Sequence, residues 1–412
     1  RGRVLVAAGA ALQVLGAAGL GGLGLAVGSS SWAQPGGRGE AWASSLLLAA
    51  RLVQGLGGGL QVGLVSNQIA RLVPKDQRPS RNTDFFLACT LGIGLGPLVA
   101  SLARLCGRAV RLHGSAGLEA ILLAGTVLPL ASLFGVLVYP DLRSVKDYHE
   151  PEVVNHAPEV VTPRQRLEAQ TGQPWKIFVV VCCLLMQVLR TFAISSLEAA
   201  LTLLLKREYS WPAIWVGVAT FATLASVLPL KWVYNVYKDY ASITTWLRLQ
   251  IGVALVGACL LFPLPGPLAA YRGWWDRSDL LMLLGSQLLF PTLALSSGLI
   301  MGIMQDHVMP SGSWLDLNTS NLLALSGSDM VGRGSGPTLA RGAIEAHGQG
   351  GYALQQLGAG LLAFGLHEMV ARVRVQHEER GPCVQGGEGA AGDRRPEREA
   401  EAEWVPGPKA CI

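Results

Sequence analysis

Long apolar stretches separated by polar connections run through most of the chain. Each stretch is close to the ~20 residues that a helix needs to cross a bilayer. They lie at about 4–27, 44–71, 84–106, 117–139, 175–205, 211–234, 244–265, 279–304 and 350–373, and a weaker one lies within 316–346. This series predicts an all-α, polytopic membrane helix bundle with about ten spans, rather than the core helices of a large soluble protein.

The composition also indicates a membrane protein. Hydrophobic residues make up 50% of the chain and charged residues only 15%, against about 25% charged in soluble domains. The 51 glycines suit tightly packed membrane helices. The net charge of +5 does not indicate a nucleic-acid partner, because the basic residues sit mainly in connections, where they orient helices. The expected partner is therefore the lipid bilayer, and no nucleic acid is expected as a partner.

A polar connection at 140–174 divides the spans into two sets. Residues 1–139 are predicted to form a partial N-terminal bundle of four spans, and 175–373 a C-terminal bundle of five or six. The Gly-, Glu- and Arg-rich tail, 374–412, is predicted to be disordered. Lys and Arg are more frequent in the connections on the side of 140–174, which places that connection in the cytosol.

The organisation into two helix sets around a long central connection resembles the major facilitator superfamily. The segment AARLVQGLGGG (49–59) resembles the Arg and Gly-rich pattern of that family's fourth helix. LGIGLGPLVAS (91–101) resembles its fifth-helix GxxxGP motif, although the usual final Gly-Gly is Ala100-Ser101 here. The resemblance implies two six-helix halves that rock about a site at mid-membrane. It also implies a monomeric, N-terminally truncated chain that lacks the first two helices.

A narrower resemblance concerns one branch of that superfamily. FAISSLEAALTLLLKREYSWPAIWVG (192–217) and GPTLARGAIEA (336–346) are similar to the seventh and eleventh helices of SPX-linked vacuolar phosphate transporters and lysosomal ceroid-lipofuscinosis-type proteins. This similarity implies a vacuolar or lysosomal membrane and makes phosphate one candidate substrate.

Charged residues inside the spans are the candidate substrate-binding residues, because a charge at membrane depth is costly and usually has a function. Arg51 is expected to bind an anionic solute, although it lies near enough to a boundary to snorkel to the headgroups. Glu198 could exchange a proton and so couple proton flow to transport; alternatively it forms a structural pair with Arg190. Those two residues lie roughly 80° apart around a helix and ~12 Å along it, so direct contact is not expected.

The weak run near the C-terminus holds two more candidates, Arg341 and Glu345. Their i, i+4 spacing predicts a pair on one helix face. The surrounding Gly- and Ser-rich sequence leaves two interpretations open: a broken helix that lines a cavity, or a loop. Asp329 and Arg333 form a second pair of the same spacing, expected nearer a membrane edge.

Glycines four residues apart at Gly55, Gly59 and Gly63 predict a helix face that another helix approaches closely. The segment GLGGLG (19–24) matches the dinucleotide-binding pattern GxGxxG, but it lies inside an apolar run with no preceding strand. No metal-ligand spacing of His and Cys occurs. We therefore expect no enzymatic activity, no cofactor and no metal.

Together these features predict secondary active transport of a small, anionic and proton-coupled solute by alternating access between two helix bundles. Two alternatives stay open. One is a channel-like anion conductance, in which the cations set selectivity. The other is a membrane scaffold, or a fragment, that does not transport.

Overall fold

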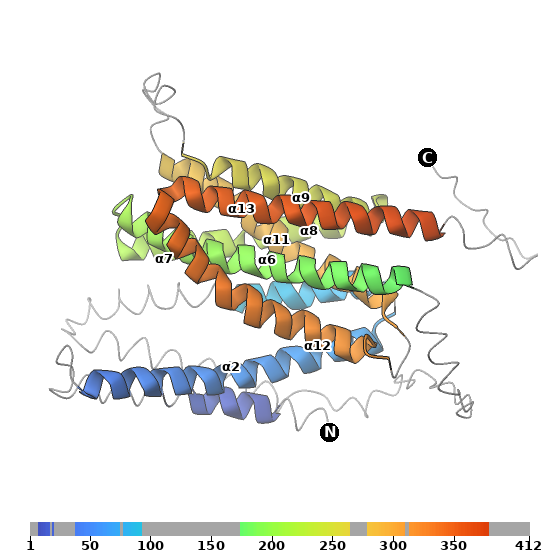
Figure 1. Ribbon diagram of the computed structural model, residues 1–412, viewed down its shortest axis with the longest axis horizontal. Helices are drawn as coiled ribbons and strands as arrows, with labels where there is room; N and C mark the ends of the chain where they lie inside the picture. Colours follow the sequence, from blue (N-terminus) through green and yellow to red (C-terminus); the bar gives the residue numbers. More distant parts are fainter. Residues whose placement is uncertain are drawn as a thin grey trace, which may run out of the picture. The chain divides into compact units, whose positions relative to one another are not determined.

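The computed structural model describes residues 7–16, 19, 38–74, 77–92, 174–263, 278–309 and 313–378 (Figure 1). All regular structure within these ranges is helical, which confirms the predicted all-α fold class. The chain divides into two compact units, Arg1–Val373 and Arg374–Ile412. All of the helical packing described below lies in the first unit.

The labelled helices are α2 (Arg38–Leu72), α6 (Pro174–Arg207), α7 (Ala213–Ala225), α8 (Val227–Tyr237), η3 (Lys238–Tyr240), α9 (Ile243–Leu260), α11 (Ser278–His307), α12 (Leu317–Gly327), η4 (Ser328–Arg333) and α13 (Gly334–Glu378). Two further helices cover residues 7–16 and 78–92.

Four helical stretches of the described residues are long and apolar enough to cross a membrane: Pro174–Arg207, Ala213–Tyr240, Ile243–Leu260 and Asp279–His307. They coincide with four of the predicted apolar runs. The run at 117–139 and the connection at 140–174, apart from Pro174, lie outside the described residues.

Helices α6, α9 and α11 form the packed centre of the C-terminal set (Figure 1). Helix α11 contacts both of the others, and its approach to α9 is close enough to require glycine on each side. A Cβ added to Gly257 would lie 2.8 Å from the Gly285 oxygen, and one added to Gly285 would lie 2.7 Å from the Gly257 oxygen. The core around this crossing is apolar and includes the fully buried Phe290 and Tyr352.

The weak run at 316–346 is helical, so its interpretation as a loop is wrong. Helix α12 begins at Leu317 and is capped by Asp316, whose Oδ1 accepts a hydrogen bond of 2.8 Å from the Thr319 amide. It continues through the π-helical turn η4 into α13. The first kink after η4 comes at Gly348, where φ is +63°, a conformation that favours glycine.

The close contact predicted along Gly55, Gly59 and Gly63 of α2 is not seen at the last two of these glycines, and the surroundings of Gly55 lie outside what the structure describes. No described residue lies within 4 Å of a Cβ added to Gly59 or Gly63. The contact occurs instead at Gly57, where an added Cβ would lie 2.9 Å from the Gln13 amide nitrogen in the helix of residues 7–16. Because two residues correspond to ~200° around a helix, the face of α2 that is packed among the described residues is roughly opposite the predicted one.

Candidate functional site

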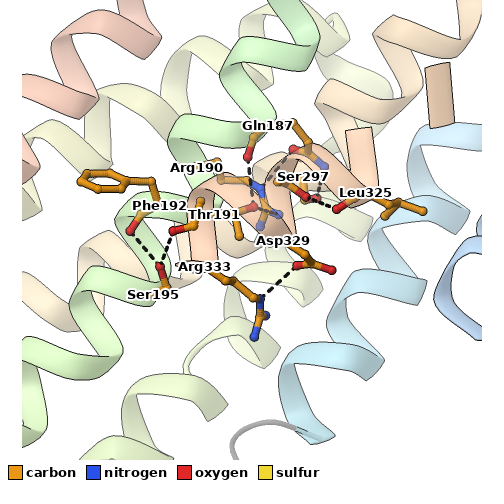
Figure 2. A network of polar contacts seen from close by, with 11 residues as sticks. Gln187, Arg190, Thr191, Phe192, Ser195, Ser297, Leu325, Asp329 and Arg333 are labelled. Carbon is orange, nitrogen blue, oxygen red and sulfur yellow. Dashed lines mark hydrogen bonds and ion pairs between the residues drawn. The ribbon is translucent and has the colours of Figure 1, made fainter. Parts of the chain in front are cut away.

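The side chain of Arg190 lies near the middle of α6 and is held by neutral groups (Figure 2). Its Nε donates to Gln187 Oε1 at 3.1 Å, and its Nη2 donates to Thr191 Oγ1 at 2.9 Å. The guanidinium carbon also lies 5.6 Å from the centre of the Phe86 ring. No described carboxylate forms an ion pair with it. Its neutral partners therefore orient the guanidinium group but do not neutralise its positive charge.

The Gln187 side chain anchors this arrangement to the neighbouring helix. Its Nε2 donates to Ser297 Oγ of α11 at 2.8 Å, and the residue is fully buried. The Thr191 hydroxyl donates to the Gln187 carbonyl oxygen at 3.0 Å, one turn earlier in α6. Because both partners of Arg190 are fixed in this way, the guanidinium is held in place before any ligand arrives.

The π-helical turn η4 packs directly against the same part of α6 (Figure 2). A Cβ added to Gly332 would lie 2.9 Å from both the Val188 oxygen and the Phe192 nitrogen. The Ser195 hydroxyl donates to the Gly332 carbonyl oxygen at 3.1 Å. Single π-turns inside α-helices are frequently found at functional sites, and this one widens the turn that faces α6.

The η4 turn carries the ion pair between Asp329 and Arg333, at 3.2 Å (Figure 2). Both charges act electrostatically on Arg190. The pair therefore lies beside the middle of α6, and the expectation of a position nearer a membrane edge does not hold. Three charged groups, of which two are positive, are gathered between α6 and η4.

Glu198 lies two turns after Arg190 in α6, and it forms no ion pair with Arg190 or any other described residue. Its Oε1 is buried and accepts no hydrogen bond from the described part of the chain. Arg333 is near enough to act on it electrostatically. The spacing argument against direct contact between Glu198 and Arg190 is confirmed, and the alternative of a structural pair between them is not seen.

Arg341 and Glu345 do form the predicted i, i+4 pair, at 2.8 Å. Their side chains are 73% and 48% exposed, and Glu345 is near enough to Arg207 at the end of α6 to interact with its charge. Arg207 lies ~25 Å along the helix from Arg190. The structure therefore separates this pair from Arg190 and Glu198. The side chain of Arg51, in α2, lies outside what the structure describes.

A cavity of about 30 Å³ adjoins Arg190 inside the C-terminal set, with walls from α6, α9, α11 and α13. That volume is enough for only one or two water molecules. Gln356 lines it, and its buried Oε1 has no partner among the described residues. This space suits ordered water rather than a larger ligand.

Some residues of the site carried no distinctive sequence signal. Gln187 stands out as a polar residue in an apolar run, but Ser297 and Phe86 are ordinary for membrane helices. The π-turn depends on contact with α6 and leaves no local pattern in the sequence. Among the described residues, no group of three or more His, Cys, Asp or Glu could hold a metal ion.

Three comparisons show which known proteins this chain resembles in sequence and in fold. The sequence model of the Major Facilitator Superfamily matches residues 3–321. No curated protein sequence matches the chain.

Solved structures with a similar fold include the proton:xylose symporter XylE of E. coli. Its TM-score is 0.62 at 15% identity, covering 90% of this chain and 79% of that one. The transporter FucP gives 0.57 at 13% identity, with coverage of 91% and 83%. A bacterial homologue of the iron transporter ferroportin gives 0.56 at 16% identity, with coverage of 90% and 84%. At these identities the similarity concerns the fold alone.

Proposed function

Because the chain belongs to the major facilitator superfamily, and is thus a multi-pass membrane protein for secondary transport of a small solute, we propose that its solute is an anion bound at Arg190. The proposal rests above all on one observation: the Arg190 guanidinium is oriented by Gln187 and Thr191 but has no described carboxylate partner. An unneutralised cation at membrane depth is costly, and a transported anion would offset that cost.

The chemistry of guanidinium favours a carboxylate or a phosphate group. A planar guanidinium donates two parallel hydrogen bonds to such groups and stays charged at every physiological pH. The N–H groups of Arg190 that do not bond to Gln187 or Thr191 are available to donate to a ligand. Phosphate is the candidate that the branch resemblance adds, and the same resemblance favours a vacuolar or lysosomal membrane.

Glu198 supports a role for protons in the cycle. A buried carboxyl group without a partner among the described residues can bind a proton in one state of the transporter and release it in another. Its position in α6, two turns from Arg190, lets anion binding and protonation influence each other through Arg333. We propose that the anion moves together with a proton and that the transporter acts as a monomer.

The test is uptake of radiolabelled phosphate and a panel of small carboxylates into liposomes that contain the full chain. We expect at least one anion to enter faster than into empty liposomes. Arg190→Gln should abolish this uptake, and Arg190→Lys should lower it, because a lysine cannot reproduce the bidentate geometry. Anion uptake that is undiminished in Arg190→Gln would overturn the proposal. Current recordings in planar bilayers distinguish a transporter from a channel-like anion conductance, because a channel passes currents far above the turnover of a transporter.

A further inference from the structure

The charged groups beside Arg190 lie on two elements that pack against each other. Arg190 is in α6, and Asp329 and Arg333 are in the η4 turn (Figure 2). Arg333 Nε lies 3.2 Å from Asp329 Oδ1, so this ion pair adds no net charge. Within the described part of the chain, these are the two charged residues that act on Arg190. Two positive charges and one negative charge leave the group with a net charge of +1.

The helix of residues 78–92 faces this group with neutral side chains. The Phe86 ring lies 5.6 Å from the Arg190 guanidinium carbon. Cys89, about one turn later, is near enough to interact with the charges of the η4 ion pair. The charged residues of this helix lie in its first two turns, and Asp84 among them is paired with a lysine of α8. The net charge beside Arg190 is therefore set by α6 and η4.

The hydrogen bonds of Arg190 leave room for one anionic group. A guanidinium has five N–H donors, and the bonds to Gln187 and Thr191 use one on Nε and one on Nη2. The donors that remain are on the neighbouring nitrogens Nη1 and Nη2, which suits a single carboxylate or phosphate. A second negative charge on the same ligand would find Arg333 already bonded to Asp329. The cost of removing that second charge from water would then not be offset.

We propose that Asp329 is a specificity-determining residue that limits the site to one negative charge, so that the solute is a monoanion. The inference rests on the proposed function, in which Arg190 binds an anion, and it narrows the class of that anion. A monoanion makes the group neutral, whereas a dianion would leave one negative charge in excess. Without the Asp329 carboxylate, the two arginines would balance a dianion.

Glu198 extends the same argument to the proton. Its buried Oε1 has no hydrogen-bond partner in the described ranges, and Arg333 acts on its charge. With Glu198 ionised, it and the three groups beside Arg190 have no net charge; with Glu198 protonated, their net charge is +1. Protonation and anion binding therefore favour each other. One monoanion moves with one proton, and the cycle transfers no net charge.

The test uses pairs of ligands that differ by one charge. Malonate is compared with its monomethyl ester, and methyl phosphate with dimethyl phosphate, at about pH 8, where the acid groups are ionised. The measurement is the KM for uptake into liposomes that contain the full chain. We expect the unmodified protein to take up the monoanion of a pair with the lower KM. A transport current during monoanion uptake on a solid-supported membrane would overturn the one-to-one movement with a proton.

Asp329→Asn should shift the preference toward the dianion. Coulomb energy is proportional to the charge of the ligand. A two- to fivefold fall in KM for the monoanion, as for a partly exposed pair, thus corresponds to a fall of roughly 4- to 25-fold for the dianion. The double variant Asp329→Asn with Arg333→Gln is the matched control, because it restores the net charge of +1. It should also restore the preference for the monoanion.

A preference that is unchanged in Asp329→Asn, or that the double variant does not restore, would overturn the inference. If Asp329→Asn does not give a monodisperse protein, Arg333→Gln alone decides, since it lowers the net charge and should raise the KM of the dianion more than that of the monoanion. Uptake that depends on Arg190 but treats both members of a pair alike contradicts only this inference. Uptake that is undiminished in Arg190→Gln contradicts the proposed function as well.

Discussion

Two ion pairs of identical spacing occupy different environments, and this difference can be measured. Asp329–Arg333 lies against α6 beside Arg190, whereas Arg341–Glu345 is exposed near the end of that helix. Asp329 is the one described carboxylate whose charge acts on Arg190, so it competes with an anion for the same cation. We expect Asp329→Asn to lower the KM for anion uptake two- to fivefold, corresponding to about 0.5–1 kcal/mol for a partly exposed pair.

Glu345→Gln is the control for this prediction, because it removes the same kind of charge from the same helical stretch. Its KM should match that of the unmodified protein. Initial rates of phosphate or carboxylate uptake into liposomes give both values. An equal change in the two variants would show that Asp329 acts only through the general charge of the protein.

Glu198 is the residue that we expect to set the pH dependence of uptake. Glu198→Gln removes the proton that the buried carboxyl can carry, so uptake driven by a pH gradient should be lost. Exchange of labelled for unlabelled anion without a gradient should continue, since it needs no net proton movement. Glu208→Gln, an exposed position just beyond α6, should retain the full pH dependence. Gradient-driven uptake that persists in Glu198→Gln would remove Glu198 from the coupling.

Part of the site could be predicted from residue spacing, and part could not. Helical geometry alone separates Arg190 from Glu198 and joins Arg341 to Glu345, and both results are confirmed. The position of Asp329 and Arg333 beside α6 depends on the close approach of Gly332 to Val188, which is a tertiary contact. Spacing within one helix carries no information on which neighbouring helix it meets.

At the scale of helices, the crossing of α9 and α11 depends on two glycines that face each other. A Cβ on Gly285 would lie 2.7 Å from the Gly257 oxygen, so Gly285→Ala must push the two backbones apart. We expect a loss of about 1–3 kcal/mol, as for other overpacked sites. The corresponding fall in Tm, about 1 °C per kcal/mol for a chain of 412 residues, can be measured by thermal unfolding in detergent.

The same helix supplies the control. No described atom lies within 4 Å of a Cβ added to Gly252 of α9. Gly252→Ala should leave Tm unchanged or raise it slightly, because alanine favours the helix over glycine. If both substitutions lower Tm equally, the loss of stability is due to an effect of alanine on α9 and α11 themselves, or on their contact with lipid. It is then not due to the crossing of the two helices.

The apolar runs predicted the helices well where a run is long and strongly apolar, as for 175–205 and 279–304. They were less informative at 316–346, where Gly, Ser and charged residues weaken the pattern. That stretch is helical because tertiary contacts with α6 stabilise it. The glycine face of α2 shows the same limit: spacing identifies glycines that can be packed, but the neighbouring helix determines which of them are.

At the scale of the whole molecule, the two helix sets meet through a charge pair. Lys231 of α8 lies 3.0 Å from Asp84, and its side chain is only 5% exposed. Its Nζ also donates to the Ser80 carbonyl oxygen at 3.3 Å. Lys231→Met leaves the Asp84 carboxylate facing an apolar side chain, so we expect a loss of about 1–2 kcal/mol, moderated because Asp84 is partly exposed.

Arg81 tests whether this loss is specific to the contact between the sets. Arg81 also approaches Asp84, at 3.8 Å, but it lies on the same helix and its side chain is 60% exposed. Arg81→Met should lower the free energy of unfolding by no more than about 0.5 kcal/mol, because exposed ion pairs contribute little. The change in Tm should be correspondingly small. The exchanged pair Lys231→Asp with Asp84→Lys should recover part of the stability lost in Lys231→Met. If Arg81→Met and Lys231→Met were equally destabilising, charge near Asp84, rather than a bridge between the two helix sets, would account for the effect.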